Sequence, residues 1–230
     1  MKRYFLSALA SLTLLLNACK KDAPDFTGYD SNGTVITTPQ TGGGQLDTYL
    51  PASKGTYWKY QVTTGAKTDT NVITLTGNKT IIAGKTYLDA TSKQTGMDEQ
   101  PGYFYAGNHI YTLTATAAGI TLEFLYLNDT TAVGNSWTAN LTTDGKVNGV
   151  PARLKGKIIE KDISRTVLAK SFNNVMHTQI NIEYDFLDGR GFQNYGTYDY
   201  YIAKGIGLIE TDSEVIGITT TSKIFDYAIK

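Results

Sequence analysis

The chain has 230 residues, in which 21 Lys and Arg side chains balance 21 Asp and Glu side chains, with two His and one Cys. Zero net charge provides no positive field for a nucleic-acid backbone, so we expect no nucleic-acid partner. One Cys cannot form an internal disulfide, and one Cys with two His cannot complete a structural zinc site, so we predict neither a metal nor a cofactor. The apolar fraction of 41% is sufficient for a folded core, and the length fits one domain.

The first 18 residues have the pattern of a secretory signal peptide. Lys2 and Arg3 precede an apolar run over residues 4–16, which is shorter than the roughly 20 residues that a membrane-spanning helix requires. The run continues into Leu16-Asn17-Ala18-Cys19, a sequence that resembles the lipobox of bacterial lipoproteins. This resemblance implies that Cys19 is lipidated and becomes the mature N-terminus, so that its acyl chains attach the protein to a membrane.

The residues that follow Cys19 bear on its destination. Lys20-Lys21-Asp22 comes next, whereas the inner-membrane retention signal of such lipoproteins is an Asp directly after the Cys. The charged opening also resembles that of Bacteroidetes-type lipoproteins displayed on the cell surface. The resemblance therefore implies a lipid-anchored protein of the outer membrane, facing either the periplasm or the cell exterior.

Residues 19–46 are predicted to be the lipidated Cys and a flexible tether. They are rich in Gly, Ser, Thr and Asp and contain no apolar run that could stabilise a fold. A flexible chain of this length has a typical reach of roughly 30 Å, enough to hold a domain clear of the lipid headgroups. The strand-like residues 34–38 leave open the alternative of a first β-strand here.

From residue 47 to residue 230, apolar residues alternate with polar ones, which is typical of β-strands with one buried face. The predicted strands cover residues 56–64, 70–76, 79–83, 86–93, 102–106, 109–116, 120–127, 136–142, 151–161, 164–171, 174–187, 196–203, 207–213 and 215–229. The alternation is clearest in the segment 174–187, where the expected buried face carries Met176, Thr178, Ile180, Ile182, Tyr184 and Phe186. Turn-forming pairs between the segments, such as Gly77-Asn78 and Asp188-Gly189, predict hairpins.

Up to fourteen short antiparallel strands in one domain over residues 47–230 imply a large all-β meander. Unpaired strand edges invite association with other chains, so a stable sheet must protect them. We therefore predict a meander that closes into a barrel or a strongly curled half-barrel, lipocalin-like in outline.

Two short segments of this domain resemble uncharacterised lipoproteins of Bacteroidetes. The first is a strand start of the form Pro-x-x-x-Gly-x-x-Trp-x-Tyr, and the second is a Tyr-rich strand that runs into a Gly-x-Gly-Leu turn. In this chain the residues concerned are Pro51, Gly55, Trp58 and Tyr60, and then Tyr198, Tyr200, Tyr201, Gly205, Gly207, Leu208 and Ile209. No activity is known for such lipoproteins, so the resemblance implies only an envelope location and a β architecture.

The sequence contains none of the common motifs of hydrolases or metalloenzymes. There is no Gly-x-Ser-x-Gly, His-Glu-x-x-His or Cys-x-x-Cys motif, and His109 and His177 stand alone. Paired carboxylates could still support glycosidase chemistry, because their spacing is set by the fold. The candidate acids Glu183 and Asp185 lie on the polar face of a predicted strand, where acids usually serve solvation. We therefore predict no catalytic residue.

Aromatic residues are the positive feature of the chain, which has 16 Tyr and two Trp. Tyr combines a flat apolar ring with a hydroxyl, so exposed Tyr side chains can stack on sugars or line an apolar lumen. The alternative is that Tyr is simply a favoured residue of β-strands. The candidate ligand-binding residues are Trp58, Tyr60, Tyr103, Tyr105, Trp137, Tyr198 and Tyr200.

Three classes of function remain open. We expect a non-enzymatic, lipid-anchored module that binds a glycan or a protein partner through an exposed aromatic strip. The alternative is a lipocalin-like carrier of a small apolar ligand, which requires a cavity inside the barrel. The third class is a carboxylate-based glycoside hydrolase, which requires two acids converging in a cleft. Trp58 and Trp137 discriminate between these classes, because a carrier would have them line a cavity and a structural role would bury them.

Overall fold

The computed structural model describes residues 47–117 and 120–230. The predicted signal peptide, Cys19 and the tether lie outside the described residues. As predicted, the domain is all-β, and the described residues contain no helix. The strands are β1 (Tyr57–Thr64), β2 (Lys67–Ile82), β3 (Lys85–Gln94), β4 (Gln100–Gly107), β5 (Ile110–Ala117), β6 (Ile120–Asn128), β7 (Ser136–Asn140), β8 (Lys146–Val147), β9 (Val150–Val167), β10 (Lys170–Tyr184), β11 (Gln193–Ala203), β12 (Gly207–Val215) and β13 (Ile218–Ala228).

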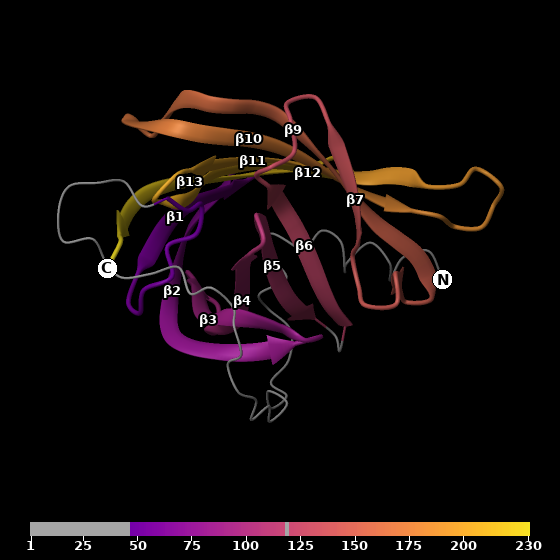
Figure 1. Cartoon of the computed structure of the whole chain (residues 1–230), viewed down its shortest axis with the longest axis horizontal. Helices are drawn as coiled ribbons and strands as arrows, with labels where there is room; N and C mark the ends of the chain where they lie inside the picture. The colour runs from indigo at the N-terminus through magenta and orange to yellow at the C-terminus, as the bar shows by residue number, and fades with distance from the viewer. Residues whose placement is uncertain (1–46, 118–119) are drawn as a thin grey trace.

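One antiparallel sheet contains all of these strands and curls into a nearly closed barrel (Figure 1). Its order is β6-β5-β4-β3-β2-β1-β13-β12-β11-β10-β9-β7, with β8 paired to β9. Two meanders, β1 to β6 and β9 to β13, are therefore joined by the pairing of the first strand with the last. The seam lies between β6 and the β7–β9 edge, where Glu123 N donates to Leu141 O at 2.8 Å. Behind this edge, Thr178 Oγ1 of β10 donates to Tyr126 O of β6 at 2.7 Å. The predicted barrel is confirmed, with one seam left open.

Along most strands the buried side chains are those that the alternation of apolar and polar residues predicted. In β10 the predicted inner residues from Met176 to Tyr184 are all buried, and their outward neighbours are partly exposed. Phe186 is an exception, because β10 ends at Tyr184 and the Phe186 side chain is 38% exposed in the following loop. The predicted strand was too long because the first loop residues continue the alternation of polar and apolar side chains.

Several predicted strand boundaries differ from the structure, and two of them change how the chain is divided into strands. Residues 70–76 and 79–83 form a single strand, β2, because Gly77-Asn78 makes a bulge between Leu75 and Lys79 and not a hairpin turn. Residues 164–171 are divided between β9 and β10 by a turn at Leu168-Ala169, whose φ angles are 45° and 67°. Such left-handed turns normally carry Gly or Asn, so this turn gave no sequence signal.

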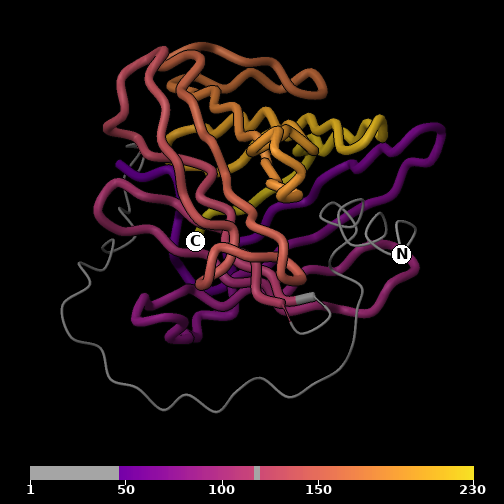
Figure 2. The backbone as a smooth tube through the Cα atoms, turned by 90° about the vertical axis from the view of Figure 1, so that its right-hand side faces the viewer, coloured from indigo at the N-terminus to yellow at the C-terminus, as the bar shows by residue number. Residues whose placement is uncertain are grey.

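The distal part of the β9–β10 hairpin, residues 161–174, leaves the barrel wall and lies over β12 and β13; we call it the arm (Figures 1 and 2). The bend has a local cause, since the β9–β10 register shifts three times between Phe172 and Thr178. Bulges of this kind bend a strand and increase its twist. Asp162 and Asn174 adopt positive φ angles of 55° and 52° on the two sides of the same bend.

The segment before β1 packs into one end of the barrel. Tyr49 and Leu50 are buried in the core, and the Tyr49 ring meets Tyr111 of β5 edge-to-face at 5.9 Å. On the other side, Gly205 N in the β11–β12 turn donates to Thr48 O at 2.6 Å. The described part of the domain therefore begins at the end of the barrel that this turn borders.

Two matched Tyr-to-Phe changes test whether the hydrogen bonds of buried Tyr hydroxyls affect the stability of the core. The Tyr60 hydroxyl donates to Leu208 O at 2.8 Å, whereas the buried Tyr198 hydroxyl has no hydrogen-bond partner. We expect Tyr60→Phe to lower the free energy of unfolding by about 1 kcal/mol and Tyr198→Phe to raise it by a similar amount, because a buried hydroxyl without a partner is destabilising. Urea unfolding followed by fluorescence measures both changes, and equal losses in the two variants would contradict this account.

Candidate functional site

The two sequence segments that resemble lipoproteins contact each other across the fold. The indole Nε1 of Trp58 donates to Ile206 O at 2.7 Å, and the Tyr60 hydroxyl reaches Leu208 O, each across 148 residues of sequence. A Cβ at Gly207 would lie 3.5 Å from the Trp58 Nε1, so this position accepts the ring closely. Trp58 and Tyr60 thus connect β1 to the start of β12. Their exposed fractions of 3% and 4% leave no surface for a ligand to contact from outside.

Tyr198 and Tyr200 also lie in the core. Their rings stack with centroids 6.0 Å apart, and each meets a ring of β6 across the barrel interior. The chain of neighbouring rings runs through Tyr49, Tyr111, Tyr126, Tyr200, Tyr198 and Phe124. Burial raises the pKa of both Tyr198 and Tyr200. These rings fill the interior that a carrier would need to keep open.

Trp137 of β7 is partly exposed and covers Gly156 of β9, its directly paired residue. A Cβ added at Gly156 would overlap the indole ring, so the glycine provides the space that the ring occupies. The indole Nε1 is nevertheless buried and without a hydrogen-bond partner. Trp137 therefore closes the β7 edge of the sheet and does not join the other candidate residues.

Tyr103 and Tyr105 are the remaining candidates, and they lie on the outer face of β4, opposite the buried Phe104. Both are partly exposed. The Tyr105 ring lies 5.6 Å from that of Tyr87 on β3, which is fully buried. We call the group formed by the partly exposed rings of Tyr103 and Tyr105 and the buried ring of Tyr87 the tyrosine platform. It brings together only two of the seven residues selected from the sequence.

Polar side chains flank the tyrosine platform in one row across four strands. Asp89 of β3 pairs with Tyr103, Tyr103 pairs with Thr114 of β5, and Thr114 pairs with Glu123 of β6. Residues that pair directly across antiparallel strands share a face and lie about 5 Å apart at Cβ. The Tyr103 ring is therefore bordered by a carboxylate on one side and a hydroxyl on the other.

Three polar atoms of this group, namely Tyr87 Oη, Asp89 Oδ1 and Thr114 Oγ1, are buried and make no hydrogen bond of good geometry. Burial raises the pKa of Tyr87, and a weak hydrogen-bonding contact with Thr114 opposes this shift. Burial also raises the pKa of the Asp89 carboxyl, although a hydrogen bond from Thr80 to the other carboxylate oxygen opposes the shift. An unpaired buried polar group costs about 1–3 kcal/mol, so three on one face make it the least satisfied polar region that the described residues contain outside the barrel interior.

One ion pair borders the tyrosine platform. Lys85 Nζ at the start of β3 lies 2.9 Å from Glu123 Oε2 of β6 and 5.9 Å from the Tyr105 ring centroid. The pair spans from β3 to β6 and so crosses the two strands that carry Tyr103, Tyr105 and Thr114. Lys85, Glu123, Tyr87, Asp89 and Thr114 were not selected from the sequence. Alternation could have placed Tyr87 and Asp89 on one face, but only strand pairing shows that Thr114 and Glu123 share it.

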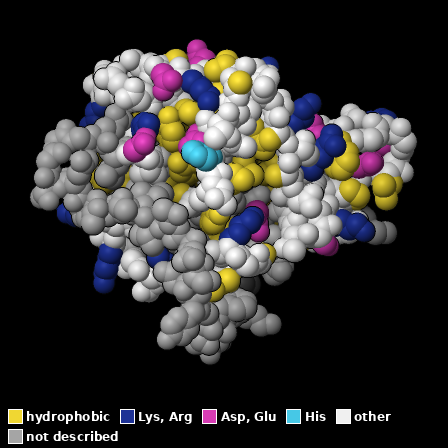
Figure 3. All heavy atoms as spheres, viewed as in Figure 1, with side chains coloured by type: hydrophobic (Ala, Val, Ile, Leu, Met, Phe, Trp, Pro, Cys, Tyr) yellow, Lys and Arg dark blue, Asp and Glu magenta, His cyan; other side chains and the backbone are white. Residues whose placement is uncertain are grey.

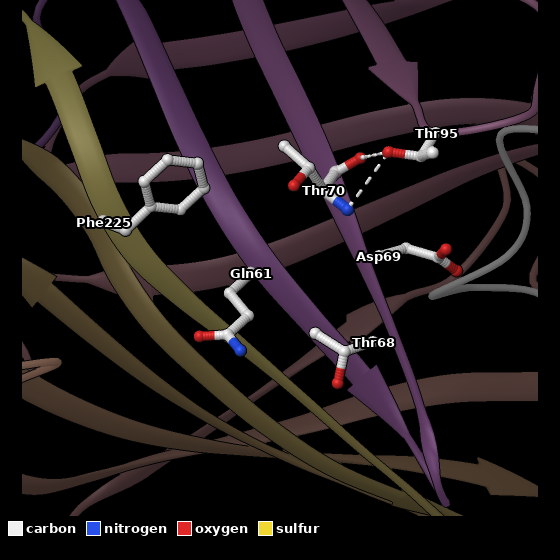
Figure 4. A pocket seen from close by; sticks show the side chains of 6 residues that line it. All are labelled: Gln61, Thr68, Asp69, Thr70, Thr95 and Phe225. Carbon is white, nitrogen blue, oxygen red and sulfur yellow. Dashed lines mark hydrogen bonds between the residues drawn. The ribbon is translucent and has the colours of Figure 1, made fainter.

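A shallow depression of about 280 Å³ lies elsewhere, across β1, β2 and β13 (Figure 4). It is lined by Gln61, Thr68, Asp69, Thr70, Thr95 and Phe225. Its polar groups are already engaged, since Asp69 pairs with Lys67 and Thr95 hydrogen-bonds to the Thr70 backbone. The depression is open and mostly polar, unlike the apolar lumen of a carrier.

The space-filling view supports the same interpretation of the interior. Hydrophobic and Tyr side chains fill the middle of the face in Figure 3, where Figure 1 shows the space between the upper sheet and β4 to β6.

Within residues 47–117 and 120–230, no three His, Cys, Asp or Glu side chains are arranged to hold a metal ion. Across the same ranges, no helix has the length and apolar character needed to cross a membrane.

The comparisons with known proteins give similar folds and no family. No protein-family model and no curated protein matches the sequence. Two solved structures are similar: a candidate exported protein with a YmcC-like fold from Bacteroides fragilis and a candidate lipoprotein from Parabacteroides distasonis. Each has a TM-score of 0.48 and 9% sequence identity, and each alignment covers 78% of this chain and 98% of the other.

Proposed function

We propose that the protein is a non-enzymatic, lipid-anchored module of the cell envelope that binds a glycan on the tyrosine platform. The observation that carries the proposal is the combination of two partly exposed rings, Tyr103 and Tyr105, with three buried polar atoms on the same face that make no hydrogen bond of good geometry. Sugars present apolar C–H faces and many hydroxyls. A flat aromatic surface next to unpaired hydrogen-bonding groups matches both properties.

The polar groups at the tyrosine platform suit a neutral hydroxylated ligand. Tyr87 and Thr114 each carry a hydroxyl that can donate or accept, and Asp89 Oδ1 accepts from a sugar hydroxyl. Lys85 is already paired with Glu123, so no free cation is provided for an acidic sugar. Small movements of the Tyr103 ring, which lies between Asp89 and Thr114, would give a ligand access to both.

The proposed location rests on the N-terminal sequence. Lys2 and Arg3 before an apolar run, followed by Cys19, support export and lipidation, and the residues after Cys19 support the outer membrane. A carrier function has less support, because the rings of Tyr126, Tyr198 and Tyr200 fill the barrel interior.

The proposed site predicts a loss of sugar binding that is separable from folding. We expect Tyr103→Ala to weaken binding of any glycan recognised on an array by about tenfold or more, since a central aromatic contact contributes more than 1 kcal/mol. Thr114→Val should weaken binding by several-fold with little change in the melting temperature, because its hydroxyl makes no hydrogen bond of good geometry in the free protein. Titration calorimetry with the best array ligand measures both effects.

Tyr57→Ala serves as the matched control, because Tyr57 is a partly exposed Tyr on β1, outside the tyrosine platform. It should leave glycan affinity unchanged. Absence of binding to every envelope and host glycan tested, or equal losses in the Tyr57 and Tyr103 variants, would refute the proposed function.

A further inference from the structure

The arm is attached to the sheet by an ion pair whose carboxylate is buried. Arg165 Nε lies 2.7 Å from Glu210 Oε2 on β12, and the Arg165 guanidinium lies 3.8 Å from the centre of the Tyr201 ring. Lys223 of β13 reaches the other Glu210 oxygen at 3.2 Å. Glu210 is only 2% exposed. The arm therefore covers a carboxylate that would otherwise face solvent on the outside of the barrel.

His177 lies at the base of the arm, within the stretch where the β9–β10 register shifts. Its Nδ1 lies 3.2 Å from Glu160 Oε2 on β9, and its Nε2 lies 2.8 Å from Asp199 Oδ1 on β11. Its ring stacks on Tyr201 at 4.3 Å, so Tyr201 contacts both His177 and Arg165. The imidazole thus connects the three strands from which the arm bends away.

The hydrogen bonds of His177 depend on its charge. A protonated imidazole donates from both nitrogens and satisfies both carboxylates, whereas a neutral ring has only one N–H. The neutral ring must therefore lose either Glu160 or Asp199, and the attraction to both carboxylates disappears with the charge. Loss of the Glu160 contact releases β9 at the point where it enters the arm.

Other charged groups lie around Tyr201, the ring on which His177 stacks. Gln179, which lies on β10 like His177, also donates a hydrogen bond to Asp199. Arg165 approaches from the arm, and β12 and β13 contribute the charged side chains Glu210, Asp212 and Lys223. Asp199 and Asp212 pair directly across β11 and β12. A positive charge on His177 offsets the repulsion between these two neighbouring acids.

We infer that His177 is a pH-responsive latch, which holds the arm against β12 and β13 when protonated and loosens it when neutral. The surface that loosening uncovers carries Glu210, Tyr201 and Lys223, so the state of the latch controls access to a charged, aromatic strip. The inference does not depend on the glycan site, which lies on β3 to β6.

The direction of the pH dependence follows from the folded-state environment. Burial lowers the pKa of His177, but the hydrogen bonds and charges of Asp199 and Glu160 outweigh it, so the pKa is raised above the ordinary value of 6.5. Stabilisation by this group is therefore fully present below pH 6.5 and is lost as the pH rises through the folded-state value. Burial and the neighbouring Glu210 also raise the pKa of Asp212, which favours the folded state at acidic pH in the same direction.

Hydrogen exchange of the arm tests the latch. Amides of residues 161–174, corrected for intrinsic exchange, should lose about tenfold in protection relative to the core amide of Ile180 between pH 5.5 and 8.5. The loss should follow the titration of the His177 ring seen by NMR, with the exposed His109 as the second ring signal. His177→Gln should show low arm protection at every pH.

Glu160→Gln provides the second variant, because its carboxylate is 51% exposed and its loss removes one of the two partners of His177. This variant should reduce arm protection at pH 5.5 and shrink the pH response. Arm protection that stays constant while His177 titrates, or a pH response that survives in His177→Gln, would overturn the latch.

Discussion

Replacing Arg165 by Met will lower the free energy of unfolding by about 3 kcal/mol, because the change leaves Glu210 buried with only Lys223 as a charged partner. Glu210 is 2% exposed, and Arg165 supplies the closer of its two ion-pair contacts. Removing one partner of a buried pair typically costs about 3–5 kcal/mol, mostly through the uncompensated charge that remains. The contact with Lys223 places the expected loss at the low end of that range. Chemical denaturation at pH 7 measures it.

Lys59→Met is the matched control for this change. It also breaks an ion pair, with Asp226 at 2.8 Å, but both side chains are more than one-third exposed. Solvent screening makes such a pair weak, so the unfolding midpoint should hardly move. Adding Glu210→Gln to Arg165→Met should recover part of the loss, since the buried charge is then removed. Equal effects of Arg165→Met and Lys59→Met would show that the arm does not bury Glu210 in solution.

Replacing Gly156 by Ala will destabilise the domain by about 2–3 kcal/mol, although Ala is ordinarily the better residue within a strand. The added Cβ would overlap the indole of Trp137, which occupies the space above the glycine. The ring must then swing outward, which exposes the part of β9 that the indole covers. Thermal unfolding measures the loss.

Gly102→Ala is the control, because Gly102 lies in β4 and a Cβ there meets no atom within 4 Å. That substitution should be neutral or raise stability by about 0.5 kcal/mol by restricting the unfolded chain. In a Trp137→Ala background, Gly156→Ala should cost little, because the clash is gone. A full cost in that background would assign the effect to the backbone of β9 and not to the indole.

The alternation of apolar residues was sufficient to predict most strands, because a half-buried strand imposes a period of two on its side chains. It failed where the backbone departs from regular pairing. Gly77-Asn78 has the composition of a turn but forms a bulge, and Leu168-Ala169 forms a turn without the composition of one. Both positions adopt left-handed φ angles that the pairing of neighbouring strands imposes.

The candidate site was only partly predictable. Tyr103 and Tyr105 were selected for their aromatic chemistry, and both lie on the outer face. Trp58, Tyr60, Tyr198 and Tyr200 were selected for the same residue chemistry, yet the fold buries them. Composition cannot separate the two groups, because Tyr occurs on both faces of the sheet and only the phase of each strand decides which face is inner.

The sequence by itself determined the all-β class, the barrel-like closure and the short-range hairpins, since these follow from local alternation and turn chemistry. Only the tertiary structure decided that β1 pairs with β13, that the seam lies beside β6, and that the arm covers Glu210. It also decided which polar groups remain unpaired around Tyr103. These features depend on contacts between residues far apart in the chain, and a local sequence pattern contains no information about which distant strand will supply the partner.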